Sequence, residues 1–273
     1  AVIAATERVV ALPGWQQRFA AGQQQANLGV FFGYDFHLNA DGAHLIEINT
    51  NAGGAFLNEL LLRSQRKVSL PGKALASDDL EQAIVAMFRR EWQLQRGDVP
   101  LCSIAIVDEA PASQYLYPEF VLAKQLFERA GISAVIADPA ELQARADGLY
   151  CGDLKVDLVY NRLTDFSLQA YPHLLAAYQH NQLVLTPHPR AYRLYADKRN
   201  LALLTDAAYL RSVGGDEATI AVLQAGIPQT RLIASGDAEQ WWAERKQWFF
   251  KPATGFGSKG SYRGDKVTRR VFE

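Results

Sequence analysis

Short apolar runs alternate with segments of helical spacing between residues 98 and 187. Strand–helix–strand alternation of this kind is typical of a parallel sheet with covering helices. The sequence therefore predicts a small α/β domain here, with Asn161 to Asp165 at the carboxyl end of a strand. The strands are expected at Leu101–Val107, Ile132–Ile136 and Val156–Tyr160, and the helices at Pro118–Ala130 and Pro139–Arg145.

The flanking segments follow a different pattern, in which helices and hairpin strands are not regularly alternated. Together with the central layer they predict an α/β chain, α+β overall, with three domains at residues 1–97, 98–187 and 188–273. Helices are expected at Glu7–Ala21, Asp78–Arg96 and Arg190–Leu204, and strands at Leu28–Leu38, Ala43–Asn49 and Trp248–Pro252.

The composition is that of a globular protein, with 49% hydrophobic and 21% charged residues among 273. A net charge of −1 gives no electrostatic reason to expect nucleic acid or an anionic membrane as a partner. No apolar run approaches the roughly 20 residues of a membrane helix. Cys102 and Cys151 are read as reduced thiols of a cytoplasmic protein, with a single disulfide as the alternative. The absence of an initiator Met and of a terminal cap signal indicates a fragment of a longer chain.

An acidic hairpin is expected around the turn Asn39-Ala40-Asp41-Gly42. A two-residue Asp41-Gly42 turn would place Asp35 and Glu47 on opposite faces, whereas a three-residue loop with Gly42 left-handed would set them opposite each other. We expect the three-residue loop, because a divalent cation held by Asp35, Glu47 and Asn49 would remove the repulsion of the facing carboxylates. The alternative is a hairpin whose charges face water.

A glycine-rich segment, Thr254–Ser261, follows the strand that ends in Lys251. Closely spaced glycines let consecutive N–H groups turn toward one anion, and Lys251 and Lys259 would add positive charge. The spacing fits neither a Walker A loop nor a dinucleotide fingerprint. A flexible hairpin turn is the alternative.

Three further charged residues are candidates for the same site. Lys198, in the segment Ala196-Asp197-Lys198, is placed to reach a nucleotide or simply to be solvated. Arg162 and Asp165 follow an expected strand at the end where α/β sheets bind ligands. A surface ion pair between them is the alternative.

These segments together resemble the circularly permuted ATP-grasp proteins, which include the glutathionylspermidine synthase-like ligases. The strand YDF and the segment LIEINTNAGG are similar to the family's Mg²⁺-binding end, and FFKPATGFGSKG to its lysine-bearing strand and phosphate loop. Between them lie VDLVYNRLTDF and YADKRNLALLTD. The acidic strand comes first, which is the reverse of the ordinary ATP-grasp order.

The resemblance implies an ATP-dependent carboxylate–amine ligase that forms an amide or peptide bond through an acyl phosphate. Mg²⁺ would be held by Asp35, Glu47 and Asn49, and Arg162 would neutralise carboxylate or phosphoryl charge as the catalytic residue. Residues 98–187 would be the Rossmann-like pre-ATP-grasp domain, and the substrates a small-molecule or peptide carboxylate and an amine. The ATP phosphates would be bound by Lys198, Lys251, Thr254, Gly255, Gly257, Ser258, Lys259 and Gly260.

The sequence departs from the family at Gly33, where the glutathionylspermidine synthases carry an arginine two residues before the acidic hairpin residue. The family also continues beyond the phosphate loop with strands that complete the adenine pocket. Two alternatives therefore stay open, a non-catalytic nucleotide- or peptide-binding module and an ATP-dependent phosphotransferase, because the parts that hold ATP do not define the acceptor.

Overall fold

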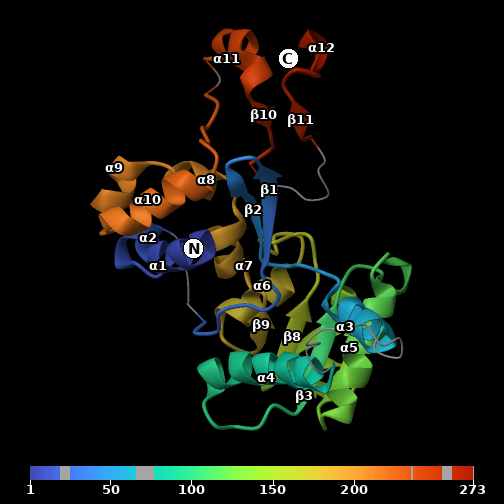
Figure 1. The fold of residues 1–273 in the computed structure, drawn as a ribbon. Helices are drawn as coiled ribbons and strands as arrows, with labels where there is room; N and C mark the ends of the chain where they lie inside the picture. Colours follow the sequence, from blue (N-terminus) through green and yellow to red (C-terminus); the bar gives the residue numbers. More distant parts are fainter. Residues whose placement is uncertain (19–24, 66–76, 235, 254–259, 273) are drawn as a thin grey trace. The chain divides into compact units, whose positions relative to one another are not determined.

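The structure is a computed structural model that describes residues 1–18, 25–65, 77–234, 236–253 and 260–272. The chain folds into two compact units (Figure 1). Unit 1 comprises Ala1–Phe19, Tyr34–Ile48 and Arg193–Glu273, and unit 2 comprises Ala20–Gly33 and Asn49–Tyr192. The fold is mixed α/β, with one parallel sheet and several antiparallel ones, as the sequence predicts.

A parallel four-stranded sheet of order β4-β3-β8-β9 forms the centre of unit 2. The chain runs from β3 through helix α5 to β4 on one side, and then returns to pair β8 on the other side of β3. The direction of winding therefore reverses between β3 and β8, and ligands of open α/β sheets bind outside the carboxyl ends at such a point. The bounds are β3 Ser103–Val107, α5 Tyr117–Arg129, β4 Ser133–Ala137, β8 Leu158–Asn161 and β9 Val184–Thr186.

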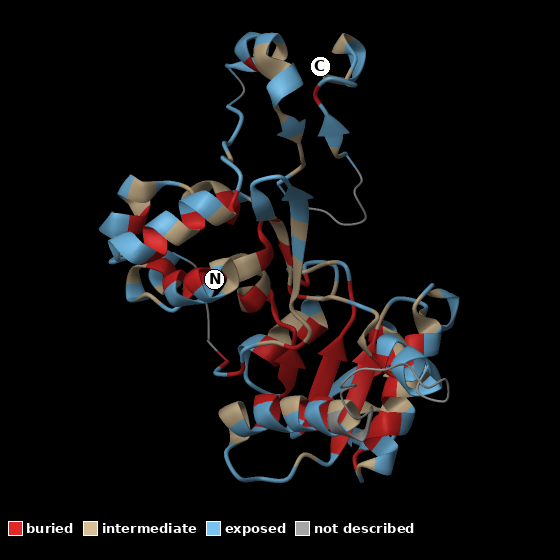
Figure 2. Ribbon diagram, viewed as in Figure 1, coloured by how far each residue is buried: buried red, intermediate tan, exposed pale blue. Residues whose placement is uncertain are grey.

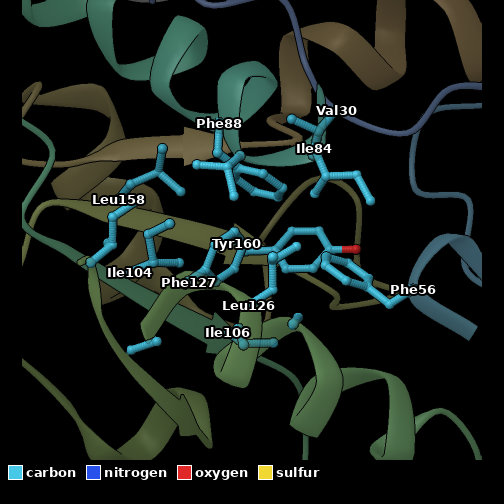
Figure 3. Close-up of a cluster of buried hydrophobic side chains, with 14 of the residues drawn as sticks. Val30, Phe56, Ile84, Phe88, Ile104, Ile106, Leu126, Phe127, Leu158 and Tyr160 are labelled. Carbon is cyan, nitrogen blue, oxygen red and sulfur yellow. The ribbon is translucent and has the colours of Figure 1, made fainter. Parts of the chain in front are cut away.

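Strands β3, β8 and β9 are buried along their whole length (Figure 2), which explains why their sequences are apolar without alternation. Successive side chains point to opposite faces, so that Ile104 and Ile106 enter one apolar cluster while Ala105 and Val107 enter the other. The first cluster is closed by α4 (Ser77–Arg96) and α5, and Figure 3 shows Phe88 there, with its ring against those of Phe127 and Tyr160. The second is closed by α6 (Pro172–Gln179) and a small antiparallel sheet.

That small sheet, of order β5-β6-β7, corrects the helix expected at Pro139–Arg145. Asp138 forms a capping box with Glu141 around the single 3₁₀ turn η2 (Pro139–Glu141), and the chain then becomes extended. Leu142 is buried and pairs with Cys151. The bounds are β5 Leu142–Arg145, β6 Gly148–Cys151 and β7 Leu154–Val156.

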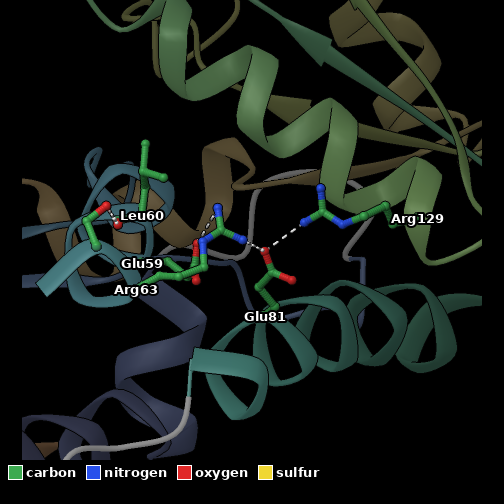
Figure 4. A network of polar contacts seen from close by, with 6 residues as sticks. Glu59, Leu60, Arg63, Glu81 and Arg129 are labelled. Atoms are coloured by element: carbon green, nitrogen blue, oxygen red, sulfur yellow. Dashed lines mark hydrogen bonds and ion pairs between the residues drawn. The ribbon is translucent and has the colours of Figure 1, made fainter. Parts of the chain in front are cut away.

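Helices α3 (Ala55–Gln65), α4 and α5 are linked by a polar network on Glu81 (Figure 4). The Glu81 carboxylate accepts hydrogen bonds from Arg63 of α3 at 3.4 Å and from Arg129 of α5 at 2.7 Å. Arg63 also lies 3.8 Å from Glu59. Because both arginine side chains are about half exposed, each ion pair contributes about 1 kcal/mol or less to the free energy of unfolding.

The expected strand Leu28–Leu38 is wrong over its first part, since regular pairing begins only at Gly33. The buried carboxylate of Glu91, on α4, instead accepts the backbone N–H groups of Leu28 at 2.9 Å and Gly29 at 2.8 Å. It also accepts from the side chains of Asn27 at 3.0 Å and Thr186 at 2.7 Å. These bonds fix the segment to α4 and β9 and leave it no strand partner.

Unit 1 contains the helices that begin before residue 19 or after residue 192, together with most of two short two-stranded sheets, β1-β2 and β10-β11. Pro13 interrupts the helix expected at Glu7–Ala21, because proline removes an N–H donor and ends the first helix before it. Two helices result, α1 (Val2–Val10) and α2 (Pro13–Arg18). Other bounds are β1 Gly33–Asn39, β2 Gly42–Asn49, α9 Ala207–Ser212, α10 Glu217–Gly226, α11 Ala238–Glu244, β10 Phe249–Phe250, β11 Tyr262–Arg263 and α12 Arg269–Phe272.

The helix expected at Arg190–Leu204 is also divided. It becomes α7 (Pro189–Ala191), a π-helical turn η3 (Tyr192–Ala196) and α8 (Arg199–Leu204). The break falls at Asp197 and Lys198, and it places Lys198 at the start of α8. Lys198 is therefore on a helix end rather than on the side of a helix.

The units divide the chain differently from the three expected ranges, since residues 49–97 cluster with the parallel sheet. Across the described residues, no helix is both long enough and apolar enough to cross a bilayer. Cys102 and Cys151 are both free thiols, as expected.

Candidate functional site

The acidic hairpin is formed by β1 and β2, with Ala40 and Asp41 between them. The expected three-residue loop is corrected, because Gly42 already belongs to β2. The side-chain oxygen of Asn39 closes the turn by accepting from the N–H groups of Asp41 at 2.9 Å and Gly42 at 3.1 Å. Gly42 has a φ of +128°, in the positive region that glycine favours. The expectation that Asp35 and Glu47 face each other rested on the three-residue loop, so the observed two-residue connection does not support it.

Glu47, on β2, is paired with two lysines of unit 1. Its Oε1 lies 3.1 Å from the Lys198 ammonium and its Oε2 lies 3.3 Å from the Lys251 ammonium. The three side chains are 21%, 13% and 24% exposed, respectively, so the pairs are screened less than surface pairs are. The structure thus brings together three of the sequence-predicted site residues.

The backbone holds the two lysines in place as well. Lys251 directly follows β10 and also donates to the carbonyl oxygen of Ile46 at 3.2 Å. The N–H of Lys198 lies 3.3 Å from the carbonyl oxygen of Ala253 and donates to it. Three segments that are distant in sequence, around residues 47, 198 and 251, therefore converge on one carboxylate.

The other expected metal ligands lie on the same hairpin. Asp35 is exposed on β1, and Asn49 is the last residue of β2. Within the described part of the chain, no group of three or more His, Cys, Asp or Glu side chains is arranged to hold a metal ion. The Mg²⁺ assignment stays a prediction that rests on the oxygen donors of the hairpin.

Of the expected phosphate loop, Gly260 is described. It is exposed, with a φ of +72° that a residue with a side chain rarely adopts. The other predicted phosphate-binding residues lie outside the described residues; these are Thr254, Gly255, Gly257, Ser258 and Lys259.

Arg162 lies in unit 2, directly after β8, and is 7% exposed. Its Nη1 donates to the side-chain oxygen of Asn51 and to the carbonyl oxygens of Asn51 and Ala52, the latter two at 3.3 Å. It also lies 3.4 Å from the Tyr160 hydroxyl. The Nε is buried and has no hydrogen-bond partner among the described residues. The surface ion pair with Asp165, which was the alternative to a ligand-binding role, is absent from the ion pairs of the described chain; Asp165 instead accepts from the N–H of Ser167 at 3.1 Å.

Glu119, a residue that no motif singled out, holds the next part of the same segment. It is 1% exposed and accepts the N–H of Gly54 at 2.7 and 2.8 Å and that of Phe56 at 3.2 Å. A carboxylate near the start of a helix is favourable because the first N–H groups of a helix lack partners. Arg162 and Glu119 together bind the carbonyl and N–H groups of residues 51–56, which follow the acidic strand.

Asp108 is a second residue that the sequence did not reveal, at the end of β3 beside β8. Burial raises its pKa to about 6, although the N–H of Glu109 and the charge of Arg162 favour the ionised form. Because the folded chain holds this proton more tightly than the unfolded chain does, the contribution of Asp108 to stability falls as the pH rises from 3.8 to about 6. A motif search does not find such a residue, because its environment sets its pKa.

Gly33, the position that departs from the resembling family, is closely packed. A Cβ there would lie 3.1 Å from the Cβ of Ala52 and 3.6 Å from that of Asn49. An arginine at this position would require Ala52 to shift. The glycine therefore matches the local packing of this chain.

Comparison with known proteins shows a similar fold among solved structures but no matching protein family. No protein-family model matches the sequence, and no curated protein is similar to it. Among solved structures, the chain is similar to a glutathione synthetase-like effector from Globodera pallida, in its apo form. The TM-score is 0.55 at 13% sequence identity, over 83% of this chain and 58% of that one. The chain thus has a mixed α/β fold similar to that of a glutathione synthetase-like protein, and it spans 58% of that neighbour's length.

Proposed function

We propose that the chain is part of an ATP-dependent carboxylate–amine ligase of the circularly permuted ATP-grasp kind. The observation that carries the proposal is the convergence of Lys198 and Lys251 on Glu47, at 3.1 and 3.3 Å, from three distant segments. The similarity of the fold to a glutathione synthetase-like protein supports it.

The charges of this cluster suit a metal-bound polyphosphate. Two ammonium groups and one carboxylate carry a net charge of +1. The lysines are suited to bind phosphate oxygens, and Glu47, with Asp35 and Asn49, offers the hard oxygen ligands that Mg²⁺ prefers. When bound, Mg²⁺ would supply charge neutralisation between the phosphates.

The reaction would need positioning more than a protein nucleophile. A substrate carboxylate oxygen would attack the terminal phosphorus, with ADP as the leaving group. The amine would then attack the acyl carbon and phosphate would leave. Lys198 and Lys251 would hold the phosphates in line. Arg162, which belongs to unit 2, keeps its predicted role of neutralising carboxylate or phosphoryl charge.

The Lys251→Ala variant tests the phosphate site. We expect Mg²⁺-ATP affinity to fall about ten- to hundredfold, as is typical of a charged hydrogen bond. Stability should change by about 1 kcal/mol or less, because Lys198 still pairs with Glu47. Isothermal titration calorimetry measures the affinity, and Lys266→Ala, at an exposed lysine of the same unit, is the control. Equal affinity in the two variants would contradict the proposal.

The acceptor is tested by turnover. ADP release that requires both a carboxylate and an amine supports a ligase. ADP release with the carboxylate or another acceptor alone, and phosphate retained on it, supports a phosphotransferase.

A non-catalytic binding module is the second candidate. It is favoured by Gly33, where an arginine would require Ala52 to shift, and by Arg162, whose Nη1 is bound to the chain's own oxygens. Measurable nucleotide binding without turnover would support this candidate.

A further inference from the structure

Glu47 is ion-paired with both lysines, Lys198 and Lys251, that are proposed to bind the nucleotide phosphates. Each carboxylate oxygen meets a different ammonium group, and Lys251 is further held by the Ile46 carbonyl at 3.2 Å. An incoming phosphate therefore competes with Glu47 for the two ammonium groups. Weakening these ion pairs has a free-energy cost that an open pair of lysines would not have.

The cost depends on whether a metal arrives with the phosphate. A metal-free polyphosphate would bring several negative charges next to the Glu47 carboxylate and take away its two partners. At most 24% of any of the three side chains is exposed, so water screens the repulsion only in part. A divalent cation reverses the effect, because the released carboxylate gains a cation as its new partner.

We infer that Glu47 is a specificity-determining residue that makes this site reject metal-free polyphosphates and accept them as metal complexes. The inference rests on the proposed function and deepens it. Metal and nucleotide binding are then positively coupled, and the coupling passes through one carboxylate. Glu47 acts here by releasing the lysines, in addition to any contact of its own with the metal.

Glu47→Gln separates this role from that of a metal ligand alone. Glutamine keeps the shape of the side chain but holds the lysines without charge. Loss of a metal ligand would weaken Mg²⁺-ATP binding only. Loss of the competing carboxylate would also strengthen the binding of metal-free polyphosphate, which is a change of opposite sign.

The experiment measures the binding of ATP and of inorganic tripolyphosphate by calorimetry, once in EDTA and once in excess Mg²⁺. In Glu47→Gln we expect metal-free tripolyphosphate to bind about tenfold more tightly than in the wild type, and Mg²⁺-ATP to bind at least tenfold more weakly. Glu217→Gln is the matched control, because it removes the same charge from unit 1 and releases Arg211, its partner at 2.6 Å. It should leave all affinities within about twofold of the wild type.

Circular dichroism and thermal melting establish that the variants are folded. If Glu47→Gln does not fold, Glu47→Asp serves instead, since the side chain is one methylene shorter and draws the carboxylate back from the two ammonium groups. It should also bind metal-free tripolyphosphate more tightly than the wild type does.

The outcomes distinguish the two proposals. If wild-type protein binds Mg²⁺-ATP and the Glu47 variants bind metal-free polyphosphate no better than it does, the inference is overturned and the proposed function stands. An equal gain in Glu217→Gln would also overturn the inference, because the effect would then be one of net charge. If the wild type binds no nucleotide under either condition, the proposed function fails and the inference fails with it.

Discussion

At the scale of single residues, two buried charged side chains hold a backbone segment by hydrogen bonds, a role that their sequence context does not indicate. Arg162 follows a strand where a ligand-binding residue is expected, yet its Nη1 binds oxygens of Asn51 and Ala52. Glu119 binds the N–H groups that come next in the same segment. Both residues are nearly inaccessible, so an unpaired partner would be left without water.

Arg162→Lys tests how much of this role is structural. A lysine keeps the charge but has one nitrogen in place of the planar fork, so the oxygens of residues 51 and 52 would lose donors. We expect the free energy of unfolding to fall by about 2–4 kcal/mol, measured by denaturant titration. Arg129→Lys, at a half-exposed ion pair, is the control and should lower the free energy of unfolding by about 1 kcal/mol or less.

The Arg162 result also bears on catalysis. Wild-type stability together with a large loss of turnover would show that the structural role is minor and that Arg162 acts on the substrate. If the variant is less stable and its turnover falls only as far as the amount of folded protein falls, then the role of Arg162 is mainly structural.

At the scale of elements, the sequence predicts what local patterns determine. Strands β3, β4 and β8 and helices α4 and α5 are found where apolar runs and helical spacing indicate them, whereas strand β9 and helix α6 were not predicted. The segment Leu28–Phe32 is apolar and reads as a strand, but a distant carboxylate, Glu91, takes its N–H groups. Residues 142–145 read as a helix and become a strand, because β6 provides a pairing edge. In both places the deciding partner is remote in sequence.

Glu91→Gln tests the long-range bonds that override the local pattern. Its carboxylate receives four donors at 2.7 to 3.0 Å, and an amide would turn one of its own donors toward them. We expect a loss of about 2–4 kcal/mol in unfolding free energy and faster hydrogen exchange at Leu28 and Gly29. Glu128→Gln, at an exposed i,i+4 pair, is the control and should change little. Unchanged exchange at Leu28 and Gly29 would contradict the assignment of their anchor.

At the scale of the whole molecule, the cluster of Glu47 with its two lysines and the two described apolar clusters belong to different units. Glu47, Lys198 and Lys251 are in unit 1, whereas both described apolar clusters are in unit 2. The sequence indicated the candidate site through the types and order of its charged residues. It did not indicate that residues 49–97 would cluster with the parallel sheet, because their apolar side chains are matched only by partners elsewhere in the chain.

This division predicts that the two units respond to different perturbations. Phe88 is fully buried, with its ring 4.8 Å from that of Phe127 and 5.1 Å from that of Tyr160, so Phe88→Ala should cost unit 2 about 3–5 kcal/mol. Val99→Ala, at a side chain that is 59% exposed, is the control. Mg²⁺-ATP should instead stabilise unit 1, by an amount that rises with the logarithm of its concentration above its dissociation constant. Scanning calorimetry should then resolve two transitions, one lowered by Phe88→Ala and the other raised by Mg²⁺-ATP. A single transition that both perturbations shift would show that the two units unfold as one cooperative body.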